Sequence, residues 1–370
     1  MKIRVQNWLI PLLLLLLTGI TTGEVKAARG EPGAPAFGFG AVIYPQDPGI
    51  QQAMTMAMDL ELDWILVPVA WKDYQANRGG MIQLGPLDMI MRTAEQNGLA
   101  VLVSVAKPPD WAITESGPNP EQAARFIQAL ASRFPKTIKA VELFPGANTR
   151  QAWGAAPDPQ AYIDLFQKVD LLIRDEPEPI LLVAAGLRPL SVLHPASDMD
   201  DLVYLEKLYR LGANQYMPVI SLQYFQLAGD PLLPPTKRER QTLRHYEDVR
   251  QVMVKNNHQS GMIWITHLSL PSSTISVAGT ATTYQEAQSA WLSQAYVQLR
   301  SQLYVGVAFL SSLNSTGEET AEEVLSLLKE TGEIHPFYPV MRQMIRLNQA
   351  GSLAAVPGRA KEGSFEKMRP

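Results

Sequence analysis

Apolar and polar positions alternate along this chain in eight repeated units, each an apolar run followed by a segment with apolar residues at helical spacing. A short apolar run predicts a buried strand, and apolar residues three and four apart predict a helix packed on one face. The predicted strands are Phe37–Tyr44, Trp64–Ala70, Leu99–Ala106, the start of Lys139–Gly154, Ile180–Ala185, Pro218–Tyr224, Gly261–Leu268 and Tyr304–Leu310. The predicted helices are Ile50–Leu62, Leu84–Gly98, Asn119–Phe134, Asp158–Arg174, Met199–Leu211, Thr236–Asn257, Thr283–Leu303, Glu318–Lys329 and Pro336–Leu347.

Eight such units predict an α/β protein with a (β/α)8 TIM barrel over residues 37–350, because each unit is long enough for a right-handed crossover between parallel strands. The alternative is an open doubly wound sheet. The number of strands argues against it, as does the lack of a Gly-x-Gly-x-x-Gly turn after the first strand.

The two ends of the chain differ from the repeated units. Lys2 and Arg4 precede an apolar run from Trp8 to Leu17, and Ala27 ends a small-residue cleavage pattern. Residues 1–27 therefore predict a signal peptide, followed by a linker at 28–36, and the product is expected to be secreted or extracytoplasmic in the cell envelope. An uncleaved membrane anchor is the alternative. The polar residues 351–370 predict a flexible tail.

Composition narrows the classes of function. Hydrophobic residues make up 46% of the chain, charged residues 18%, and the formal net charge is −4 without a basic cluster, so nucleic acid is not an expected partner. The chain has no cysteine and only five histidines, without a pair at ligand spacing, so neither a metal nor another cofactor is expected.

One stretch, Lys139–Gly154, carries a recognisable pattern. It resembles the fourth strand of clan A glycoside hydrolases, family 39-like, of the β-xylosidase and exopolysaccharide endoglycosidase branch, where Glu-Ile-Trp-Asn-Glu-Pro-Asn is followed by Trp-Gly. The residues that match or nearly match are Glu142, Leu143, Phe144, Asn148, Trp153 and Gly154. Gly146 stands at the position of the acid/base glutamate of that family.

A second stretch, Trp264–Ser269, resembles strand seven of the same family, Trp-Ile-Thr-Glu-x-Gly, in which the glutamate is the nucleophile. His267 holds that position here. Retaining glycosidases need two carboxyl groups about 5 Å apart, and Gly146 and His267 supply neither. The resemblance therefore implies a catalytically degenerate member of the family. Glu142 has two interpretations, a displaced acid or an interior carboxylate paired with an arginine or hydroxyl.

Side chains that follow the predicted strands could bind a sugar at the barrel mouth. Aromatic rings suit the C–H faces of sugars, and polar groups suit their hydroxyls. We expect Trp71, Trp111, Asn148, Trp153, Gln223 and His267 to contact the ligand, beside space left open by the glycine at 146. The alternative for the tryptophans is that they pack in the core.

The sequence thus favours an exported, carbohydrate-binding pseudoenzyme whose partner is a poly- or oligosaccharide. A second hypothesis is an active glycoside hydrolase that uses Glu142, Asp110 or Glu115 together with His267. A third is a purely structural protein of the cell envelope. Two carboxylates within about 5–10 Å of each other at the mouth would favour the enzyme.

Overall fold

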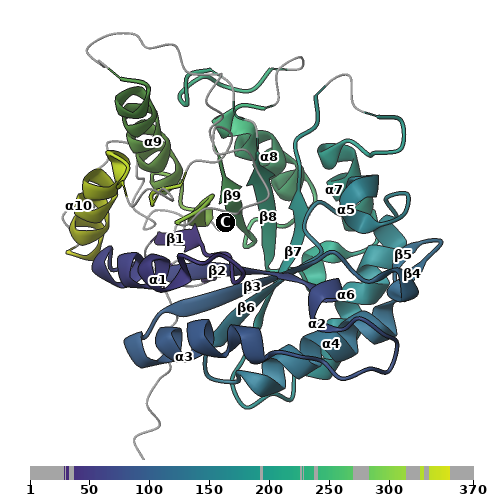
Figure 1. The fold of residues 1–370 in the computed structure, drawn as a ribbon. Coiled ribbons are helices and arrows are strands. Elements are labelled where there is room, and N and C mark those ends of the chain that lie inside the picture. Colours follow the sequence, from purple (N-terminus) through teal and green to yellow (C-terminus); the bar gives the residue numbers. More distant parts are fainter. Residues whose placement is uncertain are drawn as a thin grey trace, which may run out of the picture.

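Eight parallel strands close into a barrel in the computed structural model, and helices surround it (Figure 1). The strands follow one another around the barrel in the order β1-β10-β9-β8-β7-β6-β3-β2. Their bounds are β1 Gly38–Val42, β2 Trp64–Ala70, β3 Ala100–Ala106, β6 Ile138–Leu143, β7 Leu181–Leu187, β8 Val219–Tyr224, β9 Met262–Leu268 and β10 Val305–Leu310. The predicted (β/α)8 fold is confirmed.

The structure describes residues 29, 31–32, 37–191, 195–225, 227, 229–236, 241–269, 283–313, 326–328 and 333–350. The predicted signal peptide, most of the predicted linker and the predicted tail lie outside the described residues. Most of the predicted helix Glu318–Lys329 does so too, and its described residues Ser326 and Leu328 form β-bridges. Among the residues described, no helix is both long enough and apolar enough to cross a membrane.

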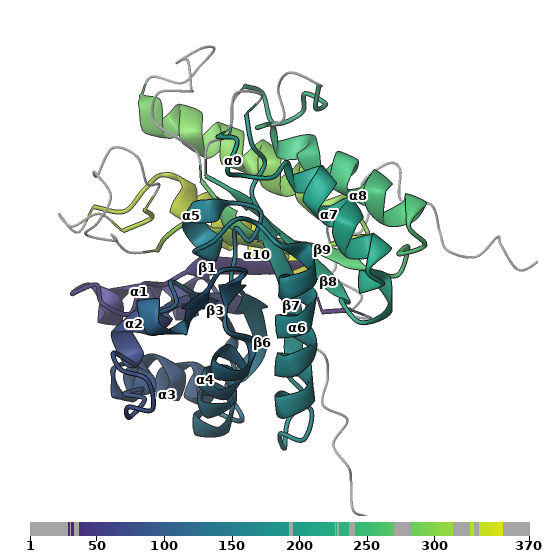
Figure 2. The same ribbon diagram turned by 90° about the vertical axis from the view of Figure 1, so that its right-hand side faces the viewer.

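The helices follow the predicted spacing closely. They are α1 Ile50–Asp59, α2 Trp71–Tyr74, α3 Asp88–Asn97, α4 Pro120–Arg133, α5 Arg150–Trp153, α6 Pro159–Ile173, α7 Asp201–Arg210, α8 Tyr246–Lys255, α9 Tyr284–Arg300 and α10 Phe337–Gln349. Short 3-10 turns are η1 Gly85–Leu87, η2 Asp110–Ala112, η3 Ala213–Gln215 and η4 Leu243–His245. The side chain of Asn119 caps α4 by accepting the backbone N–H of Gln122, as its sequence position predicts. Helices α4 and α6 lie side by side outside the barrel, as Figures 1 and 2 both show.

One predicted helix differs in extent, and one small sheet was not predicted. The predicted helix Thr236–Asn257 begins only at Tyr246, after the 3-10 turn η4. The buried His245 ends that turn and lies 2.6 Å from Asp201 of α7, so a contact with a distant residue holds the position directly before the helix. A two-stranded sheet, β4 Ile113–Thr114 and β5 Gly117–Pro118, was not predicted and lies between β3 and α4 in the chain.

The inside of the barrel is apolar at its centre and polar nearer the carboxyl ends of the strands. A separate cluster of buried residues fills the centre, among them Trp64, Ala140, Trp264 and Phe309. A Cβ on Gly40 would lie 2.4 Å from the Phe309 ring, so this position needs glycine. Each of four strands also carries one polar residue on this inner face. These residues are Ser104 on β3, Glu142 on β6, Ser221 on β8 and Thr266 on β9, and each lies two positions after a member of the apolar cluster on the same strand.

Candidate ligand-binding site at the barrel mouth

Glu142 on β6 is completely buried beneath the mouth and is surrounded by hydroxyl groups. The hydroxyl of Ser104 donates to Oε2 at 2.5 Å, and those of Ser221 and Thr266 donate to Oε1 at 2.7 and 2.6 Å. Burial raises the pKa of this carboxyl, and the three hydroxyls only partly oppose that shift. The contacts fit the interior interpretation of Glu142, with hydroxyls as its partners.

Strained turns connect this buried layer to the mouth. Phe144 and Ala185 have φ angles of 47° and 75°, a region that costs a non-glycine residue about 1–2 kcal/mol. The buried Tyr162 hydroxyl ties both turns together, because it donates to the Leu143 carbonyl at 3.0 Å and accepts the Ala185 N–H at 2.5 Å. Such strain is concentrated at functional sites in proteins, which directs attention to the end of the barrel where these turns lie.

Gly146, for which the sequence resemblance predicts the position of an acid/base glutamate, lies in the first of these turns. Its φ angle is 83°, and its N–H donates to the Gly186 carbonyl at 2.7 Å. A Cβ added there would lie 2.8 Å from Arg188 Nε and 2.8 Å from Ala152 Cβ. The expectation that glycine leaves open space is therefore wrong, because the side chains of Arg188 and Ala152 fill it.

Arg188 follows β7 and is held in place by several groups. The Asn148 side chain accepts the Arg188 N–H and donates to the Arg188 carbonyl, both at 3.0 Å. The guanidinium donates from Nε to Gln223 Oε1 at 3.1 Å and lies 4.6 Å from the centre of the Phe225 ring. Burial lowers the pKa of Arg188, and the negative charges of Glu142 and Asp198 oppose that shift. The mouth thus holds a cation beside Gly146.

His267 on β9, for which the sequence resemblance predicts the position of the nucleophile, lies in the same cluster. Its ring stacks on Phe225 with centroids 4.1 Å apart, and only 8% of the residue is exposed. Burial, assisted by the nearby Arg188 charge, lowers the pKa of His267 to about 3. The imidazole is therefore neutral at neutral pH and supplies no negative charge to a developing sugar cation.

A pocket of about 210 Å³ opens beside this cluster. Polar side chains from three segments contribute to it, since Arg188 follows β7, Gln223 lies on β8 and Gln241 precedes η4. Its complete lining is Arg188, Pro189, Leu190, Gln223, Tyr224, Phe225 and Gln241. Of the predicted ligand contacts, Gln223 lines this pocket, and His267 stacks on one of its lining residues.

The structure corrects the predicted role of three other residues. Trp71 and Trp153 have no exposed surface, because their rings pack among buried aromatic residues such as Phe126 and Phe144. Asn148 is also fully buried, and its amide binds backbone groups, including the Met199 carbonyl at 3.1 Å. These three residues shape the site from within, and none presents a face to a ligand.

Trp111 is the predicted aromatic contact that stays half-buried at the surface. Its indole N–H donates to the Ala76 carbonyl at 3.0 Å, and its ring meets Trp71 edge-on at 5.5 Å. The two alternative carboxylates, Asp110 and Glu115, are exposed, and Asp110 directly precedes Trp111 in the chain. Trp111 therefore remains a candidate for stacking against a sugar.

Sequence reasoning missed Arg188 and the hydroxyls around Glu142. Arg188 had one signal, a single cation directly after an apolar strand, where barrel proteins place functional residues. Ser104, Ser221 and Thr266 had a weaker one, since each is a hydroxyl within an otherwise apolar strand.

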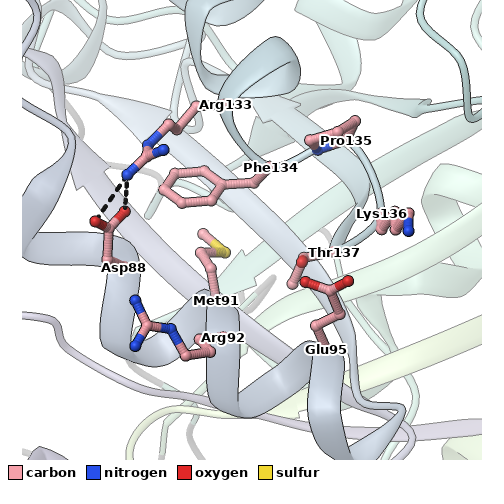
Figure 3. Close-up of a pocket in the computed structure, with 9 residues that line it drawn as sticks. All are labelled: Asp88, Met91, Arg92, Glu95, Arg133, Phe134, Pro135, Lys136 and Thr137. Atoms are coloured by element: carbon pink, nitrogen blue, oxygen red, sulfur yellow. Dashed lines mark hydrogen bonds and ion pairs between the residues drawn. The ribbon is translucent and has the colours of Figure 1, made fainter.

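A second pocket, about 340 Å³, lies next to the amino-terminal end of β6 and thus away from the mouth. Figure 3 shows its lining, in which Arg133 forms an ion pair with Asp88 at 2.8 Å across the groove. Phe134 and Met91 lie between the charged groups. In the part of the chain that the structure describes, no group of three or more acidic or histidine side chains is arranged to hold a metal ion.

Comparison with known proteins supports the fold. No family model and no curated protein sequence matches this chain. A family 39 glycoside hydrolase from Bacteroides cellulosilyticus WH2 aligns with a TM-score of 0.62 and 13% identity, over 82% of this chain and 62% of that one. An intracellular xylanase from Thermoanaerobacterium saccharolyticum aligns with a TM-score of 0.58 and 11% identity, over 83% of this chain and 95% of that one. A β-glucosidase from Exiguobacterium marinum aligns with a TM-score of 0.56 and 11% identity, over 85% of this chain and 98% of that one.

These neighbours share the barrel and little sequence, so the likeness concerns the fold. This chain spans 62% of the length of the family 39 enzyme. The resemblance inferred from Lys139–Gly154 is confirmed at a coarser level: the chain has the barrel fold of clan A glycoside hydrolases.

Proposed function

We propose that this protein is a glycoside-hydrolase-like barrel that binds a poly- or oligosaccharide at the mouth and does not hydrolyse it by the two-carboxylate mechanism. The observation that carries the proposal is the pair of groups at the mouth. The Arg188 guanidinium occupies the space beside Gly146, and the neutral His267 stands where the nucleophile would be.

The chemistry of glycoside hydrolysis supports this reading. One carboxylic acid must protonate the leaving oxygen, and one carboxylate must stabilise or attack the sugar carbon as positive charge develops there. A guanidinium at the first position does not release a proton near neutral pH and repels that positive charge. Binding a sugar requires no catalytic carboxyl groups, because polar donors such as Gln223 and an aromatic face such as Trp111 are sufficient.

An active hydrolase with non-standard residues is the second candidate. Its acid would be Glu142, whose raised pKa suits a proton donor. Against this candidate, Glu142 has no exposed surface, and within the described residues its hydrogen bonds go to the hydroxyls of Ser104, Ser221 and Thr266. A substrate oxygen would have to displace one of them to reach the carboxyl.

Kinship and location belong to the same proposal. The Lys139–Gly154 and Trp264–Ser269 patterns support a degenerate, family 39-like origin. The basic start, apolar run and small-residue site within residues 1–27 support export to the cell envelope, where polysaccharides are accessible. Mass spectrometry of the mature amino terminus tests the second point, since a chain that begins at Met1 in the cytoplasm would contradict export.

The test is a glycan array and a hydrolysis screen performed on one purified sample. We expect binding to at least one oligosaccharide and no release of reducing sugar. Trp111→Ala should weaken the binding and leave the thermal midpoint nearly unchanged, because the ring is half-buried at the surface. Turnover by the wild type that disappears in Glu142→Gln would establish the hydrolase instead. Absence of both binding and turnover would leave the structural role.

A further inference from the structure

The pocket beside Gln223 contains a positive charge that no protein carboxylate neutralises at close range. Among the described residues, the carboxylates of Glu142 and Asp198 act on Arg188 through their charge and form no hydrogen bond with it. Asp198 interacts with it only over a longer distance, and the Asp198 side chain accepts the Arg150 N–H at 2.8 Å. Glu142 lies in its shell of hydroxyls, and among the described residues none of its hydrogen bonds goes to the guanidinium.

The guanidinium is oriented for a ligand. Its Nε is used by Gln223, and Phe225 supports its plane at 4.6 Å. Within the described part of the chain, Nη1 and Nη2 have no hydrogen-bond acceptor. Asn148 holds the backbone at both its N–H and its carbonyl, so the position of this arginine is fixed before any ligand arrives. Such a fixed pair of N–H donors matches the two oxygens of a carboxylate.

We propose that this pocket binds the carboxylate of an acidic sugar, a uronic acid residue within the oligosaccharide. The inference rests on the proposed function and adds the class of ligand. Arg188 receives the carboxylate in a two-pronged contact, Gln223 is within reach of a ring hydroxyl, and Leu190 and Pro189 border the ring. At about 210 Å³ the pocket is smaller than the roughly 300–1,000 Å³ that suits drug-sized ligands, so it takes one sugar residue.

A neutral sugar fits this pocket less well for an energetic reason. Any ligand that enters removes water from the half-buried guanidinium, and that loss is costly unless a charged acceptor replaces the water. A carboxylate provides two charge-assisted hydrogen bonds, whereas a hydroxyl provides weaker neutral contacts. The same reasoning explains why an arginine, with its planar fork, is better suited here than a lysine.

The test compares trigalacturonic acid with its fully methyl-esterified form by calorimetry, because the ester keeps the sugar rings and removes the charges. We expect the wild type to bind the acid about 10- to 100-fold more tightly than the ester, as the loss of a hydrogen bond to a charged group implies. Arg188→Gln should remove this preference, and Arg188→Lys should keep only part of it. Arg150→Gln, a matched loss of one charge at an exposed neighbouring position, should preserve it.

Each outcome decides a separate point. Equal binding of acid and ester, unchanged in Arg188→Gln, overturns the acidic-sugar inference and leaves saccharide binding standing. Binding to no saccharide in the panel, including neutral xylotetraose and cellotetraose, overturns the proposed function itself. Sodium acetate that competes as well as trigalacturonic acid would also overturn the inference, because the sugar would then contribute nothing. If Arg188→Gln does not fold, the wild-type comparison of acid and ester still decides.

Discussion

Replacing Gly146 by alanine tests the central geometric claim, that the space beside residue 146 is already filled. The residue has a φ angle of 83°, and an added Cβ would lie 2.8 Å from both Arg188 Nε and Ala152 Cβ. Two costs should therefore combine, one from the backbone conformation and one from the crowded neighbours. Gly212 provides the matched control, because its φ angle is 89° and nothing lies within 4 Å of its hypothetical Cβ.

The magnitudes follow from these two environments. Placing a non-glycine residue in the left-handed region costs about 1–2 kcal/mol, and this alone is expected for Gly212→Ala. Overpacking a filled site adds about 1–3 kcal/mol, so Gly146→Ala should lose about 2–5 kcal/mol in total. The difference between the two variants isolates the crowding.

Urea denaturation followed by fluorescence gives both free energies of unfolding from the midpoints and slopes. Gly146→Glu should be destabilised at least as much as Gly146→Ala and should show no glycosidase activity. If Gly146→Ala costs no more than Gly212→Ala, the guanidinium and the Ala152 methyl do not fill the space, and the argument for an occupied acid position fails.

Three further predictions concern stability. Trp153→Ala should lower the free energy of unfolding by about 3–5 kcal/mol, because the ring is fully buried. Trp111→Ala should lower it far less, because that ring is only half-buried. Urea denaturation of both variants measures the difference. Burial opposes the charge on His245, but Asp201 outweighs it and raises the pKa of His245 to about 9. The charged His245 should stabilise the fold by about 3 kcal/mol below pH 6.5, and this stabilisation should be lost as the pH rises through 9. The difference in unfolding free energy between wild type and His245→Gln should therefore narrow between about pH 6 and pH 10. A difference that stays constant would contradict the ion pair of His245 with Asp201. Burial raises the pKa of Glu142, so its contribution to the free energy of unfolding should be greatest below pH 4.5, where the carboxyl is protonated in both states, and should fall as the pH rises. Glu142→Gln should remove this fall from a plot of unfolding free energy against pH.

The fold was predictable because its signal is local and repeated. The run predicted as Leu99–Ala106 is β3 Ala100–Ala106, and the predicted helix Asn119–Phe134 is α4 Pro120–Arg133 with Asn119 as its cap. Periodicity fails where distant residues decide the outcome. The helix expected from Thr236 begins at Tyr246, after a turn that ends at the buried His245.

The site was harder to predict because the direction of a side chain depends on loop geometry. Trp153 follows the fourth barrel strand, as the pattern indicated, yet its ring turns inward and its N–H donates to the Ser116 carbonyl at 2.7 Å. A Cβ on Gly117 would lie 2.2 Å from that indole, so the packing depends on a glycine far from the motif. Arg188 lies 42 positions after Gly146, and sequence spacing alone does not reveal that the two touch.

That contact between Gly146 and Arg188 explains why the glutamate and the arginine exclude each other at this mouth. A glutamate at 146 would need the volume within 3 Å of its Cβ that Arg188 Nε now occupies, and the guanidinium is held there by Gln223 and Phe225. Restoring the acid alone therefore leaves the cation in place, where it would stabilise the ionised carboxylate and lower the pKa of the very group that must donate a proton. Two-carboxylate hydrolysis at this mouth would therefore require the loss of Arg188 as well as the gain of two carboxylates. On the proposed function, the mouth is arranged to receive a negative charge, whereas glycoside hydrolysis has to stabilise a developing positive charge.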